Sequence, residues 1–377
     1  MVGFKVGCEL YHHLGLACAA VVSFSQTIDI ALQILRTDMT DAKLHRFRRL
    51  GMLTVAAVYC LILIAGAVRA TGSGMGCPDW PTCFGQWIPP TQESQLPDNY
   101  QQIYAERGYA NTAFNAKKTW IEYSNRLVGV LIGILIFLTL LASRHFRTTN
   151  NLVTRLSVAA FFAVVFQGWL GSRVVASNLH PAMVTVHMLL AQVIVALLIC
   201  AVMRSQKEVI STDGIKQLPD SFRTVLMFAM GMTLLQMIMG TQVREAIDII
   251  ARSADTRSIW IEQLPLIFKV HRSFSSLILF TNLWCVYQVW KHIPSSNPMR
   301  RFTMALGGLI VSTIIIGVIM DRLSIPAFVQ PLHLCLASLI FGVQITVYLF
   351  LRYGSQRQQD SLSSQTGDSA AALVRGA

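Results

Sequence analysis

Eight long apolar runs alternate with short polar segments along the chain. A helix that crosses a bilayer needs about 20 mostly apolar residues, and each run is close to that length. The runs are Leu50–Val68, Trp120–Leu141, Leu152–Val175, Met183–Met203, Val225–Val243, Phe268–Trp290, Phe302–Met320 and Phe328–Leu351. The pattern therefore predicts an all-α membrane protein with eight transmembrane helices.

The second four runs resemble the first four, which predicts two duplicated four-helix bundles. The stretch His187-Met-Leu-Leu-Ala191 matches His333-Leu-Cys-Leu-Ala337, and Asn125-Arg126 matches His271-Arg272. An internal duplication of this length is a plain explanation of such matches. The expected division is a 1–46 N-terminal extension without an assigned function, a first half at 47–203, a cytoplasmic linker at 204–224, a second half at 225–352, and a disordered cytoplasmic tail at 353–377, which is rich in Ser and Gln.

Composition supports the membrane class and excludes an ordinary soluble globule. The chain is 53% hydrophobic and 13% charged, with a mean hydropathy of +0.51. The net charge of +12 does not indicate nucleic-acid binding, because the basic residues cluster in alternate connections, at 43–49, 142–155, 204–223 and 291–301. By the positive-inside tendency these segments are cytoplasmic, and both termini lie on that side of the cytoplasmic membrane.

Charged and polar residues gather where two of the apolar runs begin. Glu122, Asn125 and Arg126 lie within about one helical turn of each other at the head of a predicted helix. Charged groups in such a position are costly, so they are candidates for function. A second copy, Lys269-Val-His-Arg-Ser-Phe274, carries His271 where the first has Asn125.

Two of the eight cysteines, Cys77 and Cys83, fall in an outer segment, with prolines that bend the chain between them. A disulfide between them would suit an oxidising outer compartment. Two free thiols, or half of a metal site, are the alternatives that the spacing leaves open.

The outer segment also carries a resemblance to a known family. The string Thr71-Gly-Ser-Gly-Met-Gly-Cys-Pro-Asp-Trp-Pro-Thr-Cys-Phe-Gly85, together with the spaced histidines, resembles the first outer loop of haem A synthases, and the likeness extends over roughly residues 47–352. It implies a membrane enzyme that oxidises the C8 methyl group of the substrate haem O to a formyl group, giving haem A for terminal oxidases. It further implies an iron-containing haem cofactor, a heme O synthase and terminal oxidase assembly as partners, and a possible homo-oligomer.

The histidines predict where haem is held. The second and fourth helices of an up-down bundle are diagonal and run the same way, so His271 and His333 share a depth. Two such histidines can coordinate one haem iron from its two faces, so the pair predicts a b-type haem (heme b) in the second half. The alternative is that each is a buried polar residue bonded to a neighbour.

In the first half His187 is the predicted iron ligand, but its diagonal position holds Asn125, where the family usually has a histidine. Either His187 binds alone or another residue enters. Glu122 is the predicted catalytic residue, as a proton acceptor or an electrostatic stabiliser.

Six arginines lie at the predicted outer helix ends, against the positive-inside tendency. They are Arg69, Arg126, Arg173, Arg244, Arg272 and Arg322. Arginine pairs with carboxylates in a fork geometry, so Arg126 and Arg272 are expected to bind haem propionates, with Asn125 also lining the haem site. Snorkelling, or pairing with Glu122, Glu245 and Asp321, is the alternative.

Two other functions fit part of the sequence. A di-haem b-type electron carrier without its own chemistry explains His271 and His333 but leaves Glu122 and the cysteine loop unexplained. A transporter fits the duplication but not the matched histidines.

Overall fold

The computed structural model describes residues 42–253 and 260–375, so most of the predicted N-terminal extension lies outside the described residues. The described part contains eight long helices and no strand. They are α2 (Ala42–Ala70), α4 (Ala116–Ser143), α5 (Asn151–Ala176), α6 (Pro181–Arg204), α7 (Phe222–Ser253), α8 (Leu266–His292), α9 (Pro298–Arg322) and α10 (Val329–Arg375). Each overlaps one of the eight predicted runs, and several extend beyond it.

The helix starts follow from local chemistry. Asn115 caps α4 by accepting a hydrogen bond from the Lys118 N–H at 3.1 Å, and Asn297 caps α9 through the Met299 N–H at 3.0 Å. Proline occupies the first position of α6 and of α9, where its missing N–H costs no hydrogen bond. Successive helices pack as neighbours within each half, whether the connection is as short as 177–180 or as long as 71–115.

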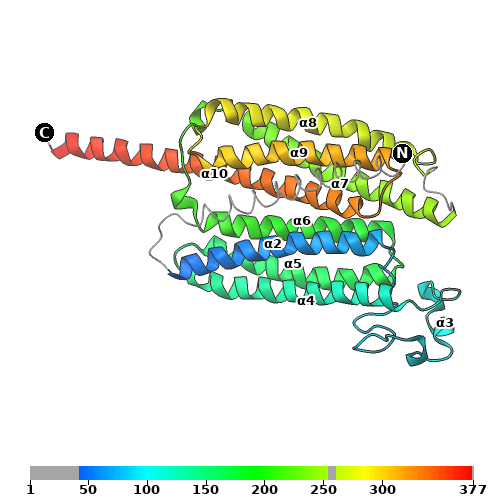
Figure 1. Ribbon diagram of the computed structural model, residues 1–377. Coiled ribbons are helices and arrows are strands. Elements are labelled where there is room, and N and C mark those ends of the chain that lie inside the picture. The colour runs from blue at the N-terminus through cyan, green and yellow to red at the C-terminus, as the bar shows by residue number, and fades with distance from the viewer. Residues whose placement is uncertain (1–41, 254–259, 376–377) are drawn as a thin grey trace, which may run out of the picture.

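The helices form two rings of four (Figure 1). In the first, α2 packs on α4, α4 on α5, α5 on α6, and α6 on α2; in the second, α7, α8, α9 and α10 follow each other in the same way. Helix α10 also packs against α2 and α6 and joins the two rings. Between the packed helices, the Gln192 amide donates to the Ser338 hydroxyl at 3.1 Å. The Gln344 amide donates to the side-chain oxygen of Asn282 at 2.9 Å.

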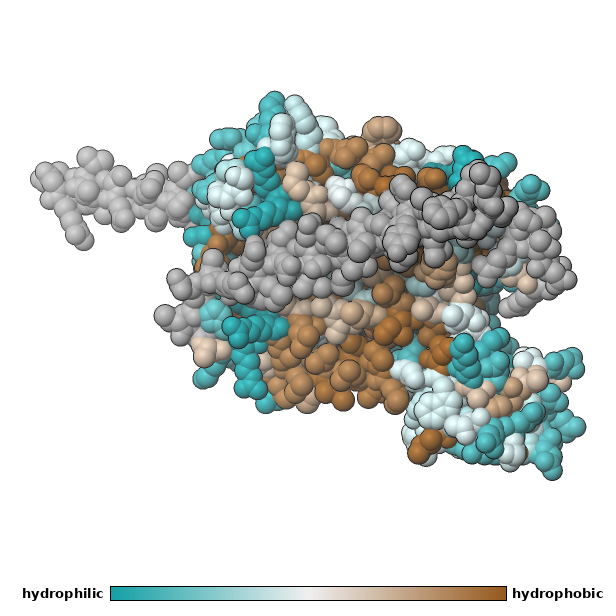
Figure 2. Space-filling model, viewed as in Figure 1, coloured by the Kyte–Doolittle hydropathy of each residue, from teal (hydrophilic) through white to brown (hydrophobic). Residues whose placement is uncertain are grey.

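By length and composition, seven helices of the described part are able to cross a membrane: α2, α4, α5, α6, α7, α9 and α10. Apolar residues gather in a band across the middle of the molecule, with polar residues toward both ends (Figure 2). The predicted eighth span falls short by this criterion, because α8 carries polar residues such as Ser275, Ser276, Asn282 and Gln288 along its length.

The end of the chain differs from the expected disordered tail at 353–377. Helix α10 continues as one helix to Arg375 and projects beyond the bundle (Figure 1). Its first turns past the bundle are anchored, since Arg357 donates to the Ile210 carbonyl and Gln358 donates to the Thr212 carbonyl at 3.0 Å. Gln, Arg and Ala are good helix formers, and no proline interrupts the segment.

The connection between α2 and α4, residues 71–115, forms a small folded unit at the opposite end of the first ring from this tail (Figure 1). It contains the short helices η1 (Glu93–Gln95), α3 (Tyr100–Ile103) and η2 (Ala105–Arg107). Phe84 is its centre and makes edge contacts with four aromatic rings, those of Tyr100, Tyr104, Tyr109 and Phe114.

Candidate functional site

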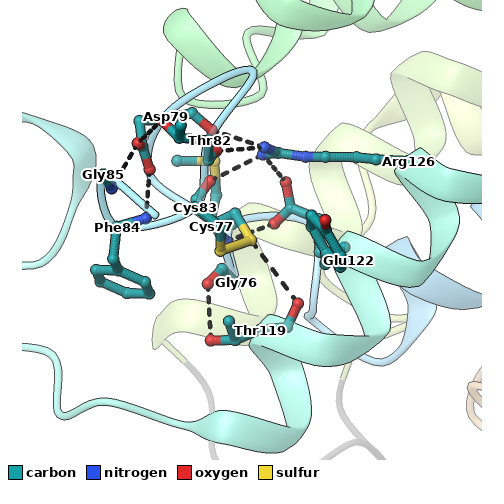
Figure 3. Close-up of a disulfide and its surroundings, with 12 residues drawn as sticks. Gly76, Cys77, Asp79, Thr82, Cys83, Phe84, Gly85, Thr119, Glu122 and Arg126 are labelled. Atoms are coloured by element: carbon teal, nitrogen blue, oxygen red, sulfur yellow. Dashed lines mark hydrogen bonds and ion pairs between the residues drawn. A yellow bond between two sulfur atoms is a disulfide. The ribbon is translucent and has the colours of Figure 1, made fainter. Parts of the chain in front are cut away.

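The head of α4 binds the cysteine loop, residues 76–85, through a buried carboxylate (Figure 3). Glu122 is only 4% exposed. Its Oε2 accepts a hydrogen bond from the Cys77 N–H at 2.8 Å, and its Oε1 faces the Arg126 guanidinium at 2.6 Å, one turn further along α4. Both oxygens therefore have partners, which allows the carboxylate to stay charged in a buried place.

Arg126 fastens the same loop from the other side. Its guanidinium donates to the carbonyls of Asp79 (2.7 Å), Thr82 (3.0 Å) and Cys77 (3.2 Å) in addition to Glu122 (Figure 3). The fork of donors on an arginine suits several acceptors at once. The Arg126 guanidinium is therefore bound to loop carbonyls and to Glu122.

Glycine at position 76 permits the close contact between loop and helix. A Cβ added there would lie 2.4 Å from the Lys118 carbonyl oxygen. The Gly76 carbonyl accepts a hydrogen bond from the Thr119 hydroxyl at 2.9 Å, and the Tyr109 hydroxyl donates to the Met75 carbonyl at 2.8 Å. Burial, and next the charge of Glu122, raise the pKa of Tyr109, so its hydroxyl remains a donor.

Cys77 and Cys83 form a disulfide, which confirms that prediction and removes the alternatives of free thiols or a metal half-site. Both are fully buried against Phe84 and its aromatic neighbours. The disulfide thus closes the loop that Glu122 and Arg126 hold (Figure 3).

A second cluster lies in the other ring, where the imidazoles of His271 in α8 and His333 in α10 face each other. Their ring centroids are 6.5 Å apart and the rings are inclined by 60°. The two helices are diagonal in the ring and both histidines lie within the first two turns of their helices. The structure thus brings together the pair that the sequence singled out.

The spacing of this pair fits one metal ion held between two imidazoles. A metal–imidazole bond is about 2 Å long, so two rings that share a metal lie about 6 Å apart between centroids. The described residues contain no group of three or more metal-ligating side chains, so an ion here needs further ligands from elsewhere, such as the four nitrogens of a porphyrin. The Nδ1 atoms of both rings are buried without a hydrogen-bond partner.

His187 lies at the matching place in α6 of the first ring. Its Nδ1 is also buried without a hydrogen-bond partner. The Oδ1 of Asn125, on the diagonal helix α4, is likewise buried without a hydrogen-bond partner. Such atoms cost about 1–3 kcal/mol each when nothing satisfies them, and each of His187, His271 and His333 has one at Nδ1.

The arginines at the helix ends that are expected to face outward differ in exposure and in their partners. Arg272 is mostly exposed; it lies 3.5 Å from Asp321 and over the ring of Phe268. Arg69 of α2 and Arg244 of α7 share Asp248, at 2.9 and 2.6 Å. Asp248 was not singled out by sequence reasoning, and no motif marks it, because its role depends on the two rings meeting at this corner.

Two glutamines were also missed as site residues. Gln167 of α5 donates to the backbone carbonyl of His187 at 2.9 Å, and Gln236 of α7 donates to that of His271 at 2.9 Å. A signal was present, since each glutamine precedes a glycine by four residues, at Gly171 and Gly240. Both glycines contact the same histidines.

The chain is similar to known proteins over most of its length. Residues 48–345 match the family model described as cytochrome oxidase assembly protein. A heme A synthase of Methylobacterium sp. is 24% identical over 79% of this chain and 90% of its own length, and one of Brucella anthropi is 24% identical over 82% and 92%. A heme A synthase of Shewanella oneidensis is 26% identical over 43% of this chain, and the match spans less than half of that relative, 46% of its length. Because the family match covers most of the chain, this protein belongs to the family of cytochrome oxidase assembly proteins.

Proposed function

We propose that this protein is a haem A synthase, which oxidises the C8 methyl group of haem O to a formyl group. The observation that carries the haem-binding part of the proposal is the His271–His333 pair, with ring centroids 6.5 Å apart on diagonal helices. The relatives named heme A synthase that align over most of this chain support it.

In this proposal the second ring, within residues 225–352, holds a b-type haem between His271 and His333. Two imidazole ligands occupy both faces of an iron, which suits electron transfer rather than binding of a further reactant. Arg272 lies one residue after His271, and its exposed guanidinium is available to a propionate. Its weak contact with Asp321 at 3.5 Å is easily exchanged for a closer carboxylate.

The first ring, within residues 47–203, holds the substrate haem O, with His187 as iron ligand. The duplication of the two rings supports this, because His187 in α6 corresponds to His333 in α10. Asn125 in α4 corresponds to His271 in α8, and an amide is a poor iron ligand, so one face of the substrate haem stays accessible. When bound, haem iron supplies the oxidising chemistry for the methyl C–H bond.

Glu122 is the proposed catalytic residue, acting as a fixed negative charge. Both of its oxygens are engaged, by the Cys77 N–H and by Arg126, which suits electrostatic stabilisation of a developing positive charge. Proton uptake would require one of these contacts to open. The predicted contact of Arg126 with a propionate likewise requires Arg126 to release a loop carbonyl, so we assign Arg126 to holding the cysteine loop over the site.

The proposed orientation places the connections rich in Lys and Arg, and both termini, on the cytoplasmic side of the cell inner membrane. The cysteine loop then lies in the outer compartment, which suits its disulfide. This orientation includes α8 as an eighth span, with its polar residues turned toward the bundle. A haem O synthase is the proposed supplier of substrate.

Haem analysis tests the proposal. Protein purified in mild detergent is extracted and its haems are separated by chromatography and identified as pyridine haemochromes. Haem B together with haem O or haem A supports the synthase. Haem B alone supports the di-haem electron carrier, and the absence of haem from correctly folded protein contradicts both.

A further inference from the structure

Each of the three candidate ligand histidines packs against a glycine on the preceding helix. A Cβ built on Gly171 of α5 would lie 3.4 Å from Cε1 of His187, one on Gly240 of α7 would lie 3.4 Å from Cε1 of His271, and one on Gly317 of α9 would lie 3.6 Å from Cε1 of His333. The three contacts repeat one geometry on three helix pairs.

The residue four positions before each glycine contributes its backbone carbonyl to the surroundings of the histidine ring. In a helix Cβ leans toward the N-terminus, so a side chain at position i covers the backbone of the preceding turn. Glycine therefore exposes the carbonyl at i−4. For Gly240 and Gly317 these are the carbonyls of Gln236 and Thr313, and they face the rings of His271 and His333.

The side chain at i−4 adds a second constraint in two of the three cases. The Gln167 and Gln236 amides donate to the backbone carbonyls of His187 and His271, both at 2.9 Å. Each hydrogen bond therefore joins the helix that carries the histidine to the preceding helix, at the position of the histidine itself. The imidazole is thereby held both at its ring and at its backbone.

The fourth position of this kind lacks the arrangement. Residue 125 of α4 would need its glycine on α2, but the α2 glycines face elsewhere: a Cβ on Gly66 would meet Pro331 of α10 at 3.1 Å, and one on Gly51 would meet Val202 of α6. The position that has no histidine also has no glycine contact. The arrangement therefore follows the histidines and is not a general feature of this helix packing.

We propose that Gly171, Gly240 and Gly317 are positioning residues, each exposing the i−4 carbonyl as the acceptor for the Nδ1–H of a ligand histidine. A bond from Nδ1–H to a backbone carbonyl fixes the tautomer, directs Nε2 to the metal and makes the ligand more basic. The three Nδ1 atoms are buried and have no other hydrogen-bond partner. The proposal rests on the proposed haem-binding function.

The test compares glycines on the same helix. Gly240→Ala adds a methyl group over the Gln236 carbonyl, whereas Gly231→Ala on the same helix adds one in open space. The same comparison in the first ring uses Gly171→Ala against Gly168→Ala, whose position is also open. The measurements are the midpoint potential and the electron paramagnetic resonance spectrum of each haem in purified holoprotein, with haem content determined in parallel.

We expect Gly240→Ala to shift the potential of the b-type haem upward and change its spectrum, because a less basic imidazole stabilises the oxidised iron less. Gly231→Ala leaves both unchanged, and Gly171→Ala changes only the haem of the first ring. Gln236→Met, which removes the amide but keeps the volume, should broaden or shift the same signal, and it supplies the readout if Gly240→Ala does not accumulate.

Equal effects of the paired alanines, or none from Gly240→Ala and Gln236→Met, would overturn the positioning role while leaving haem binding intact. A wild-type protein without haem would instead refute the proposed function on which this inference depends.

Discussion

The Cys77 N–H donates a hydrogen bond to the Glu122 carboxylate at 2.8 Å, and this contact joins the disulfide loop to the head of α4. Arg126 reaches both the carboxylate and the loop carbonyls. The predicted catalytic residue is thus also the residue that seats the loop, so its two roles need to be separated by experiment.

Replacing Glu122 with Gln tests the charge. The amide keeps the volume and an acceptor for the Cys77 N–H but loses the ion pair with Arg126. We expect haem A formation to fall by about 100-fold or more, as for the loss of a positioned charged group, with haem content retained. Chromatography of haems from cells that make haem O measures the conversion; a normal conversion would remove Glu122 from the chemistry.

Replacing Gly76 with Ala tests the loop contact. The new methyl group would lie 2.4 Å from the Lys118 carbonyl oxygen. This oxygen belongs to the backbone of α4, so it cannot move aside as a flexible side chain could. We expect the loop to detach from α4 and to be cut much faster by protease. Gly74→Ala is the matched control, because its Cβ meets only the flexible side chain of Leu179 at 3.3 Å. Equal cleavage of the two variants would refute the assigned role of Gly76.

Removing the disulfide with a Cys77→Ser, Cys83→Ser double substitution should loosen the loop without unfolding the bundle. The entropy of closing so short a loop corresponds to about 2 kcal/mol, while Arg126, Thr119 and Tyr109 still hold the loop backbone. The expected result is faster proteolysis within residues 71–115 and an unchanged melting temperature for the helices. A large drop in helix melting would show that the disulfide stabilises the whole first ring.

The Asp248 carboxylate between Arg69 and Arg244 should contribute to the contact between the two rings. Asp248→Asn leaves two guanidiniums close together, and because the groups are partly exposed we expect a loss of about 1–2 kcal/mol. Added salt should reduce the difference from wild type by screening. Thermal unfolding in detergent at low and high salt measures this, and a difference that does not depend on salt would point to packing instead.

Helix positions and the two site clusters were predictable because they depend on local sequence. Long apolar runs leave the backbone no partner but itself in a membrane, and Glu122 and the histidines stand out against such runs. The partners of Asp248 and the glycine contacts of the histidines depend on which helix faces meet, which no local pattern states. The helical course of residues 353–375 is not predicted by their Ser and Gln content, which is typical of disordered tails, because it depends on helix propensity and on the contact of Arg357 with the Ile210 carbonyl.

The central claim is that His271 and His333 bind one iron between them. Visible and electron paramagnetic resonance spectra of purified protein test it directly. The wild type is compared with His271→Ala, His333→Ala and His187→Ala. His180→Ala, in the connection between α5 and α6, is the control. The account predicts a low-spin signal from a haem with two histidine ligands that is lost in His271→Ala and in His333→Ala and retained in the other two. Survival of that signal in both His271→Ala and His333→Ala would contradict it.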